Sequence, residues 1–283
     1  MSRSPHPDGV AALVRDRLGE LSPAERKVGR ALLAGYPSAG LESVARLAER
    51  AEVSAPTVVR FATRLGFDGF VGLQQALRDE VDQRDVFPVT RMAELSPDAG
   101  GEFATVVGRA VAATFAELPD DEVERALDLL ADERGSLLLA GGRFSNLLAH
   151  YLALHLGQLR DGVVLLPTGR VERAAALAAI TRRDTLVLFD FRRYEPATAA
   201  AADLAAERRA HVVLVTDRWL SPIASAADVV LPVRVDSSSA YDSFVPALAV
   251  VELLVARLVE RGGPDAAARL ASFEGLSQRL GLL

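Results

Sequence analysis

The chain has 283 residues, of which 50% are hydrophobic and 25% are charged, and its formal net charge at pH 7 is −6. This length and composition predict a globular protein with room for two domains, and no apolar run is long enough to span a bilayer. The absence of cysteine excludes a disulfide framework and thiolate chemistry, and the four scattered histidines have no metal-binding spacing. We therefore expect a cytoplasmic protein with no membrane association, no metal and no cofactor.

The charges are distributed unevenly along the chain. Residues 1–78 contain eleven Lys and Arg against eight Asp and Glu, a net +3, whereas residues 79–283 have a net charge of −9. A mildly basic head on an acidic body is typical of a protein that contacts DNA at one end only.

Helical patterns dominate the first 84 residues, which we interpret as a head of five helices. The start of the second helix is clearly marked, because Ser22 is a good N-cap, Pro23 suits the first helical position and Glu25 closes a capping box. The expected helices cover residues 10–18, 22–34, two short patterns within 41–67, and 69–83.

The two short patterns between Leu41 and Phe67 are joined by a tight connection. Each has apolar residues at positions i, i+3, i+4 and i+7, which form one face of a helix: Val44, Leu47, Ala48 and Ala51, then Val58, Phe61, Ala62 and Leu65. Ser54 is a good N-cap for the second helix, and Gly66 suits its C-terminal end. This arrangement predicts a helix-turn-helix whose second helix enters a DNA major groove.

The outward side chains of this second helix suit DNA. They are small, hydroxylated or cationic, and no acid lies between Ala55 and Leu65. Arginine pairs bidentately with guanine, and threonine contacts base edges or a thymine methyl. We therefore predict that DNA is contacted by five residues: Ser54, Thr57, Arg60, Thr63 and Arg64. The alternative is an ordinary helical hairpin with a solvated arginine face.

The same stretch resembles the N-terminal domain of RpiR-type transcriptional regulators. The resemblance rests on Leu47-Ala48, Val53-Ser54, Thr57-Val58, Arg60-Phe61 and Leu65-Gly66-Phe67. In that family a helix-turn-helix domain precedes a sugar isomerase (SIS) domain, so the resemblance implies an α/β domain in the rest of the chain.

The remaining sequence has the pattern of such a domain. Residues 85–101 contain two Pro and end in Gly-Gly, which indicates a linker after the head at 1–84. Two helices are expected at 103–118 and 120–133. Strand-length apolar runs then cover 136–140, 163–167, 185–191, 211–216 and 229–233. Helical patterns lie between them at 145–159, 171–182, 196–209 and 221–227, followed by a long helix at 241–260 and a short one at 264–271.

Continuous apolar strands that alternate with helices indicate a parallel sheet covered on both faces. We therefore predict an α/β protein: an all-α helix-turn-helix head, and over residues 102–283 a five-stranded parallel αβα sandwich that matches the SIS fold. We expect the second domain to sense a ligand and to drive assembly into a homodimer or a dimer of dimers.

Ligands of open parallel sheets bind outside the carboxyl ends of the strands. The turn after the first strand is glycine-rich, and the helix that follows offers backbone N–H groups to an anion. It resembles the first ligand loop of the SIS family. Candidate residues from the ends of the first two strands and from the segment before the long helix are Gly141, Gly142, Arg143, Ser145, Asn146, Thr168, Ser237 and Ser238. Taken singly, each loop is better explained as an ordinary turn, and the loops converge on one pocket only if the predicted fold is correct.

The third strand departs from the family pattern. SIS domains that bind sugar phosphates carry a Ser-x-Ser-Gly-x-Thr loop there, whereas this chain has Arg192 and Arg193 after the strand. Arginine holds phosphate or carboxylate bidentately, so both arginines are candidates for binding an anionic ligand. The alternative is that they pair with Asp190, Glu195 or a neighbouring subunit.

No pair of catalytic residues is evident, because His150 and His155 do not share a helix face well and Glu252 lies among apolar residues. The leading hypothesis is a transcriptional regulator that binds double-stranded operator DNA and senses a small anionic metabolite, such as a phosphosugar or a sugar acid. The alternatives are an enzyme of the sugar-phosphate isomerase type, and a DNA-binding protein whose SIS-like domain only oligomerises.

Overall fold

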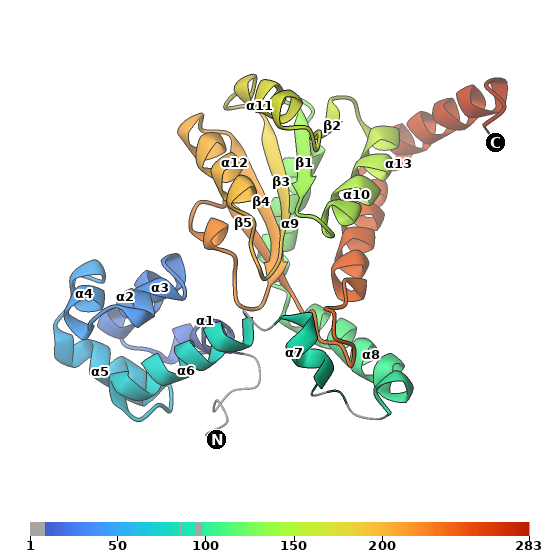
Figure 1. Cartoon of the computed structure of the whole chain (residues 1–283). Coiled ribbons are helices and arrows are strands. Elements are labelled where there is room, and N and C mark those ends of the chain that lie inside the picture. Colours follow the sequence, from blue (N-terminus) through green and yellow to red (C-terminus); the bar gives the residue numbers. More distant parts are fainter. Residues whose placement is uncertain (1–8, 85–86, 94, 96–97, 283) are drawn as a thin grey trace. The chain divides into compact units, whose positions relative to one another are not determined.

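The computed structural model describes residues 9–84, 87–93, 95 and 98–282. The chain forms two compact units, one of residues 1–94 with 217–225 and one of residues 95–216 with 226–283 (Figure 1). Nothing in the sequence pattern predicts that residues 217–225 group with the first unit. The predicted linker, 85–101, includes helix α7 (Pro88–Ala93). Its residues 85, 86, 94, 96 and 97 lie outside the described residues, and the linker stays a prediction.

The N-terminal unit is built from short helices, and the five that the sequence predicts are present. Its elements are α1 (Val10–Arg17), η1 (Leu18–Glu20), α2 (Pro23–Ala34), α3 (Ser38–Leu41), α4 (Val44–Arg50), α5 (Ala55–Arg64) and α6 (Gly69–Arg84). The structure also contains two short helices that the sequence did not predict, η1 and α3, because they have too few residues to show a helical period. The capping box forms as predicted, and the hydrogen bonds between Ser22 and Glu25 lower the pKa of the Glu25 carboxyl.

The core of this unit surrounds α5, which packs against α2, α4 and α6. Val58, Phe61 and Ala62 of α5 are completely buried. A polar contact within the core fixes the start of α1, because the buried Glu80 of α6 accepts hydrogen bonds from the Val10 N–H and from the Tyr36 hydroxyl. Burial raises the pKa of Glu80, as expected for a carboxyl group withdrawn from water.

The second unit contains the predicted five-stranded sheet, with strand order β2-β1-β3-β4-β5. Its strands are β1 (Leu137–Gly141), β2 (Val163–Leu165), β3 (Thr185–Asp190), β4 (His211–Asp217) and β5 (Val229–Val233). The strand pairs β1–β2, β1–β3 and β3–β4 are parallel. Strands β1 and β3 are buried along their whole length and β4 except at its first residue, as the continuous apolar runs predict, whereas the outer strands β2 and β5 are partly exposed.

Helices cover both faces of this sheet. They are α8 (Ala99–Glu117), α9 (Asp120–Ala131), α10 (Asn146–Leu159), α11 (Arg170–Ala178), α12 (Pro196–Glu207) and α13 (Val245–Arg279). The 3-10 turn η2 (Pro222–Ser225) follows β4 in the chain but belongs to the first unit. Helices α10 and α13 pack together on one face, and α12 lies on the other, next to α11 (Figure 1). The segment 221–227 that we predict as an α-helix forms only the turn η2.

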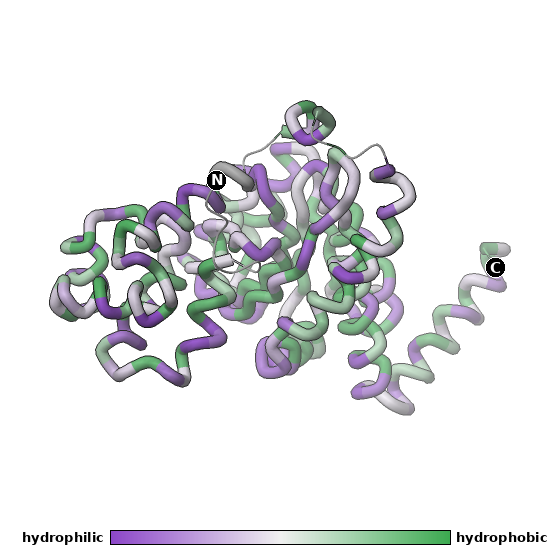
Figure 2. The backbone as a smooth tube through the Cα atoms, turned by 90° about the horizontal axis from the view of Figure 1, so that it is seen from below, coloured by the Kyte–Doolittle hydropathy of each residue, from purple (hydrophilic) through white to green (hydrophobic). Residues whose placement is uncertain are grey.

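Helix α13 differs from the prediction at both ends. It starts at Val245 and not at 241, and it continues to Arg279 and not to 271. The expected break is present, because Gly263 adopts φ 48° and ψ −124° immediately before Pro264, whose ring lacks the N–H that a continuous helix needs. Beyond the break, Figure 2 shows hydrophobic and hydrophilic residues alternating along the helix. Within the described residues, none of the helices has the length and apolarity that crossing a bilayer requires.

A buried arginine joins several turns at one end of the sheet. Arg160, at the C-terminal end of α10, is only 4% exposed. Its Nη1 atom donates to the carbonyl oxygens of Leu130 (3.0 Å) and Asp132 (2.8 Å), and its Nη2 atom donates to that of Gly135. The guanidinium thus satisfies carbonyl groups left without partners where α9 ends. Burial lowers the pKa of Arg160, and the hydrogen bonds hold the charge in place.

Candidate DNA-binding helix and ligand pocket

The predicted recognition helix is α5, and its exposed face is cationic. Arg60, Thr63 and Arg64 are exposed, as predicted for residues that reach DNA. Arg64 donates from Nη2 to the Glu20 carbonyl at 3.2 Å, which holds its side chain against the preceding part of the unit. Exposed Val59 (41%) also belongs to this face. Apolar periodicity alone does not reveal it, since valine normally indicates a core position.

Thr57 does not lie on the outward face of α5 where we placed it, and its contact with DNA stays a prediction. It is 5% exposed, so its side chain lies within the unit and not on the outer face. Its Oγ1 atom lies 2.9 Å from Ser54 Oγ and accepts a hydrogen bond from Arg60 Nη2 at 3.0 Å. Thr57 therefore positions Arg60. Ser54 occupies the N-cap position, but its hydroxyl bonds Thr57 and not the backbone N–H that we expected.

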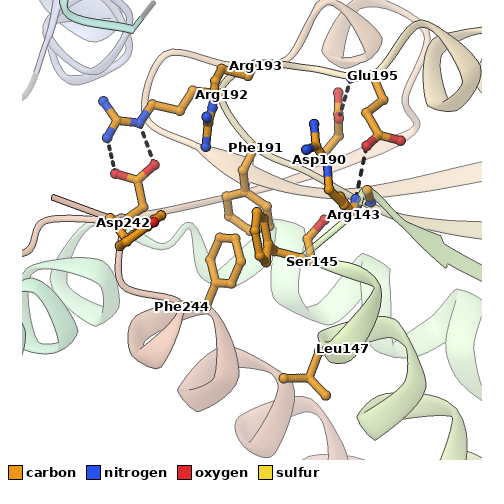
Figure 3. A pocket seen from close by; sticks show the side chains of 13 residues that line it. Arg143, Ser145, Leu147, Asp190, Phe191, Arg192, Arg193, Glu195, Asp242 and Phe244 are labelled. Atoms are coloured by element: carbon orange, nitrogen blue, oxygen red, sulfur yellow. Dashed lines mark hydrogen bonds and ion pairs between the residues drawn. The ribbon is translucent and has the colours of Figure 1, made fainter. Parts of the chain in front are cut away.

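In the second unit a cavity of about 430 Å³ lies at the carboxyl ends of β1 and β3 (Figure 3). It is lined by Gly142, Arg143, Phe144, Ser145, Leu147, Asp190, Phe191, Arg192, Arg193, Glu195, Tyr241, Asp242 and Phe244. Five of the ten predicted ligand residues are therefore in one cavity, at the edge of the sheet where the fold places ligands. These five are Gly142, Arg143, Ser145, Arg192 and Arg193.

The other five predicted ligand residues do not line this cavity. Gly141 and Asn146 form the turn itself, because the Gly141 N–H donates to Asn146 Oδ1 at 3.2 Å. A Cβ atom on Gly141 would lie 2.6 Å from the Asn146 nitrogen, so only glycine fits this turn. Thr168, Ser237 and Ser238 come from other loops. Their role in ligand binding stays a prediction.

Three backbone donors of the turn after β1, the N–H groups of Gly141, Gly142 and Arg143, are bonded within the chain. The Gly142 N–H donates to Ser145 Oγ at 2.8 Å, and the Ser145 hydroxyl donates to the Phe189 carbonyl at 2.7 Å. The Arg143 N–H donates to Glu195 Oε1 at 3.0 Å. The carboxylate of Glu195 thus lies where we expected the turn to hold the anionic group of a ligand.

Arg192 and Arg193 have different surroundings. Arg192 forms a buried bidentate ion pair with Asp242, whose side chain is only 14% exposed. This partner is neither of the acids that the sequence suggested. Arg193 is exposed and has φ 65°, a left-handed backbone conformation that few residues other than glycine adopt. In the described part of the chain, no carboxylate forms an ion pair with Arg143 or Arg193, so both guanidinium groups remain available at the cavity.

Sequence reasoning missed the apolar lining of the cavity. Phe144 lies in the turn and Leu147 follows it, and both are exposed. Phe191 packs against Phe244 with ring centroids 4.9 Å apart (Figure 3). Tyr241, which also lines it, lies on the loop before α13. The signal in the sequence was the pair of aromatic residues just before the long helix, which we read as part of that helix.

The acid and histidines considered as catalytic bases have other surroundings. Glu252 is exposed and accepts a hydrogen bond from the Tyr151 hydroxyl at 3.3 Å. The ring of His155 packs edge-on against Tyr151, with centroids 4.7 Å apart, and His150 is exposed. None of the three lines the cavity.

Comparison with known proteins finds counterparts for both units. A sequence model of the helix-turn-helix domain of the rpiR family matches residues 8–84, and one of the SIS domain matches residues 129–257. The HTH-type transcriptional regulator HexR of Pseudomonas aeruginosa is 29% identical over 265 residues, which cover 89% of this chain and 90% of HexR.

Two solved structures have a similar fold. The sugar isomerase domain of an RpiR transcription factor from Sphaerobacter thermophilus has 27% identity and a TM-score of 0.55, and the match covers 59% of this chain and 92% of that domain. NanR of Vibrio vulnificus, solved in complex with ManNAc-6P, has 18% identity and a TM-score of 0.54 over 95% of this chain and 98% of NanR. At this identity the likeness to NanR shows the fold alone.

Proposed function

We infer the function of this chain from the family to which it belongs, the RpiR-type transcriptional regulators with an N-terminal helix-turn-helix domain and a SIS domain. We propose that the protein is cytoplasmic and binds operator DNA through α5. We also propose that its SIS domain senses a small anionic, sugar-derived metabolite and does not catalyse its conversion. The observation that carries the proposal is the presence in one chain of a cationic recognition helix and a ligand-sized cavity at the carboxyl ends of the strands.

The class of effector is supported by two features. The likeness to the sugar isomerase domain of the S. thermophilus regulator favours a sugar-derived compound. The guanidinium groups of Arg143 and Arg193 at the cavity favour an anion, since arginine binds carboxylate and phosphate with charge-assisted hydrogen bonds. A cavity of about 430 Å³ also favours ligand sensing over a SIS domain that only oligomerises.

The experiment that tests this proposal measures DNA binding and ligand binding on the same preparation. Electrophoretic mobility shifts with fragments of the source genome identify the operator. A thermal-shift screen of phosphosugars and sugar acids identifies the effector, because a ligand that binds only the native state raises the melting temperature. The effector should then change operator affinity. If the protein shifts none of the genomic fragments, the proposal that it is a transcriptional regulator is wrong. If the purified protein converts a phosphosugar, the isomerase alternative is favoured.

We also propose that the chain assembles as a homodimer or a dimer of dimers. One helix-turn-helix reads a single half-site, and two-fold partners supply the second. The C-terminal end of the chain supports this, because Phe273 (43%) and Leu276 (51%) of α13 and Leu280 (63%) just after it expose apolar surface of the kind that marks protein interfaces. Light scattering of the full chain at tens of micromolar is expected to give at least twice the monomer mass of 30.2 kDa. A monomer under these conditions contradicts the proposal.

A further inference from the structure

The SIS cavity contains an acid in the position that an anionic ligand group is expected to occupy. The turn between β1 and α10 offers its Arg143 N–H toward the cavity, and the Glu195 carboxylate accepts that hydrogen bond at 3.0 Å. The same carboxylate is close to the turn itself, since a Cβ atom on Gly142 would lie 3.3 Å from Glu195 Cδ. A second anion cannot use this donor without displacing Glu195 (Figure 3).

The charges around the cavity limit the ligand's own charge. Three arginines and three acids line it, and one pair, Arg192 with Asp242, is joined in a buried ion pair. The remaining arginines, Arg143 and Arg193, balance the remaining acids, Asp190 and Glu195. A phosphate ester that carries nearly two negative charges would therefore add like charge beside two carboxylates, which is unfavourable in a partly desolvated site. A single carboxylate adds half as much and still pairs with one arginine.

The walls of the cavity favour a ligand with an apolar face. Phe144, Leu147, Phe191, Tyr241 and Phe244 contribute aromatic or aliphatic surface, while Glu195 offers a carboxylate. The C–H face of a sugar ring can lie against aromatic side chains, and its hydroxyl groups can donate to carboxylates. These walls suit a sugar ring that carries one carboxylate.

We propose that the cavity binds a sugar acid through one carboxylate and rejects sugar phosphates, and that Glu195 is the residue that sets this preference. This inference rests on the proposed function, because it takes the cavity as the effector site. Arg193 or Arg143 pairs with the carboxylate of the ligand, and Glu195 accepts a hydroxyl of the sugar while it excludes the doubly charged phosphate.

Two probes that differ only in the anionic group test the preference. D-Glucuronate carries a carboxylate at the carbon where D-glucose 6-phosphate carries the phosphate ester, and D-glucose is the neutral control. Isothermal titration of the full chain is expected to show tighter binding of glucuronate. The variant Glu195→Gln keeps an acceptor for the Arg143 N–H but removes the negative charge of the carboxylate. We therefore expect the variant to bind glucose 6-phosphate at least about tenfold more tightly than the wild type does.

A control variant shows whether the effect comes from the charge in the cavity or from the net charge of the protein. Glu207→Gln removes the same charge from the exposed end of α12, outside the cavity, and is expected to leave the ratio of the two affinities unchanged. Arg193→Ala is expected to weaken glucuronate by about tenfold or more, as expected when a charge-assisted hydrogen bond is lost.

Three outcomes overturn this inference. They are tighter binding of glucose 6-phosphate by the wild type, an unchanged ratio of affinities in Glu195→Gln, and no binding of either anion by either protein. Mobility shifts with operator DNA on the same preparations test the proposed function separately. If the protein still binds operator DNA but one of the three outcomes is observed, the proposed function as a regulator stands and only the proposed ligand class is wrong.

Discussion

Arg60→Ala is expected to weaken operator binding by about 1–3 kcal/mol, which corresponds to roughly 5- to 150-fold in affinity. Arg60 is exposed on α5, and its Nη2 atom donates to the buried Thr57 hydroxyl at 3.0 Å, which limits the directions its guanidinium takes. A guanidinium held in this way loses less conformational entropy when it pairs with a base. Mobility-shift titrations against the operator and against unrelated duplex DNA measure the effect.

Two further variants define what the Arg60 result means. Arg64→Ala is expected to weaken all DNA sequences alike and to lower the slope of log affinity against log salt by about one, as for the loss of one phosphate contact. Arg208→Ala removes an exposed arginine from the end of α12 in the other unit and should change neither quantity. If Arg60→Ala and the wild type bind the operator equally, α5 does not read the bases through Arg60.

Arg160→Met is expected to destabilise the SIS unit by about 3 kcal/mol or more. Methionine fills a similar volume but cannot donate to the carbonyl oxygens of Leu130, Asp132 and Gly135, which Arg160 bonds in the native structure. A buried carbonyl left without a partner costs about 1–3 kcal/mol. Urea denaturation followed by circular dichroism measures the loss.

An exposed arginine provides the control for this substitution. Arg182 lies on the surface after α11, and Arg182→Met is expected to change the free energy of unfolding by less than about 0.5 kcal/mol. An equal effect of both substitutions would show that the hydrogen bonds of Arg160 do not stabilise the unit. DNA binding by Arg160→Met at a temperature where it remains folded is expected to match the wild type, because Arg160 belongs to the unit without the recognition helix.

Elements that depend on local interactions could be predicted from the sequence. The capping box at Ser22 and Glu25 forms as predicted, because its partners are three residues apart and need no tertiary contact. The helix-turn-helix and the buried strands also follow from short-range periodicity, which records the face that each element buries. Gly141 is a similar case, since the tight turn after β1 tolerates no Cβ atom.

The partners of the functional side chains depend on tertiary packing and could not be predicted from local patterns. Thr57 fits the outer face by residue type, yet it is buried, because packing decides which flank of a short helix reaches solvent. Arg192 pairs with Asp242, which is fifty residues away along the chain. Glu195 reaches back across the sheet edge to the turn after β1. A pairing over such a separation depends on how strands and helices pack, and no local pattern in the sequence records it.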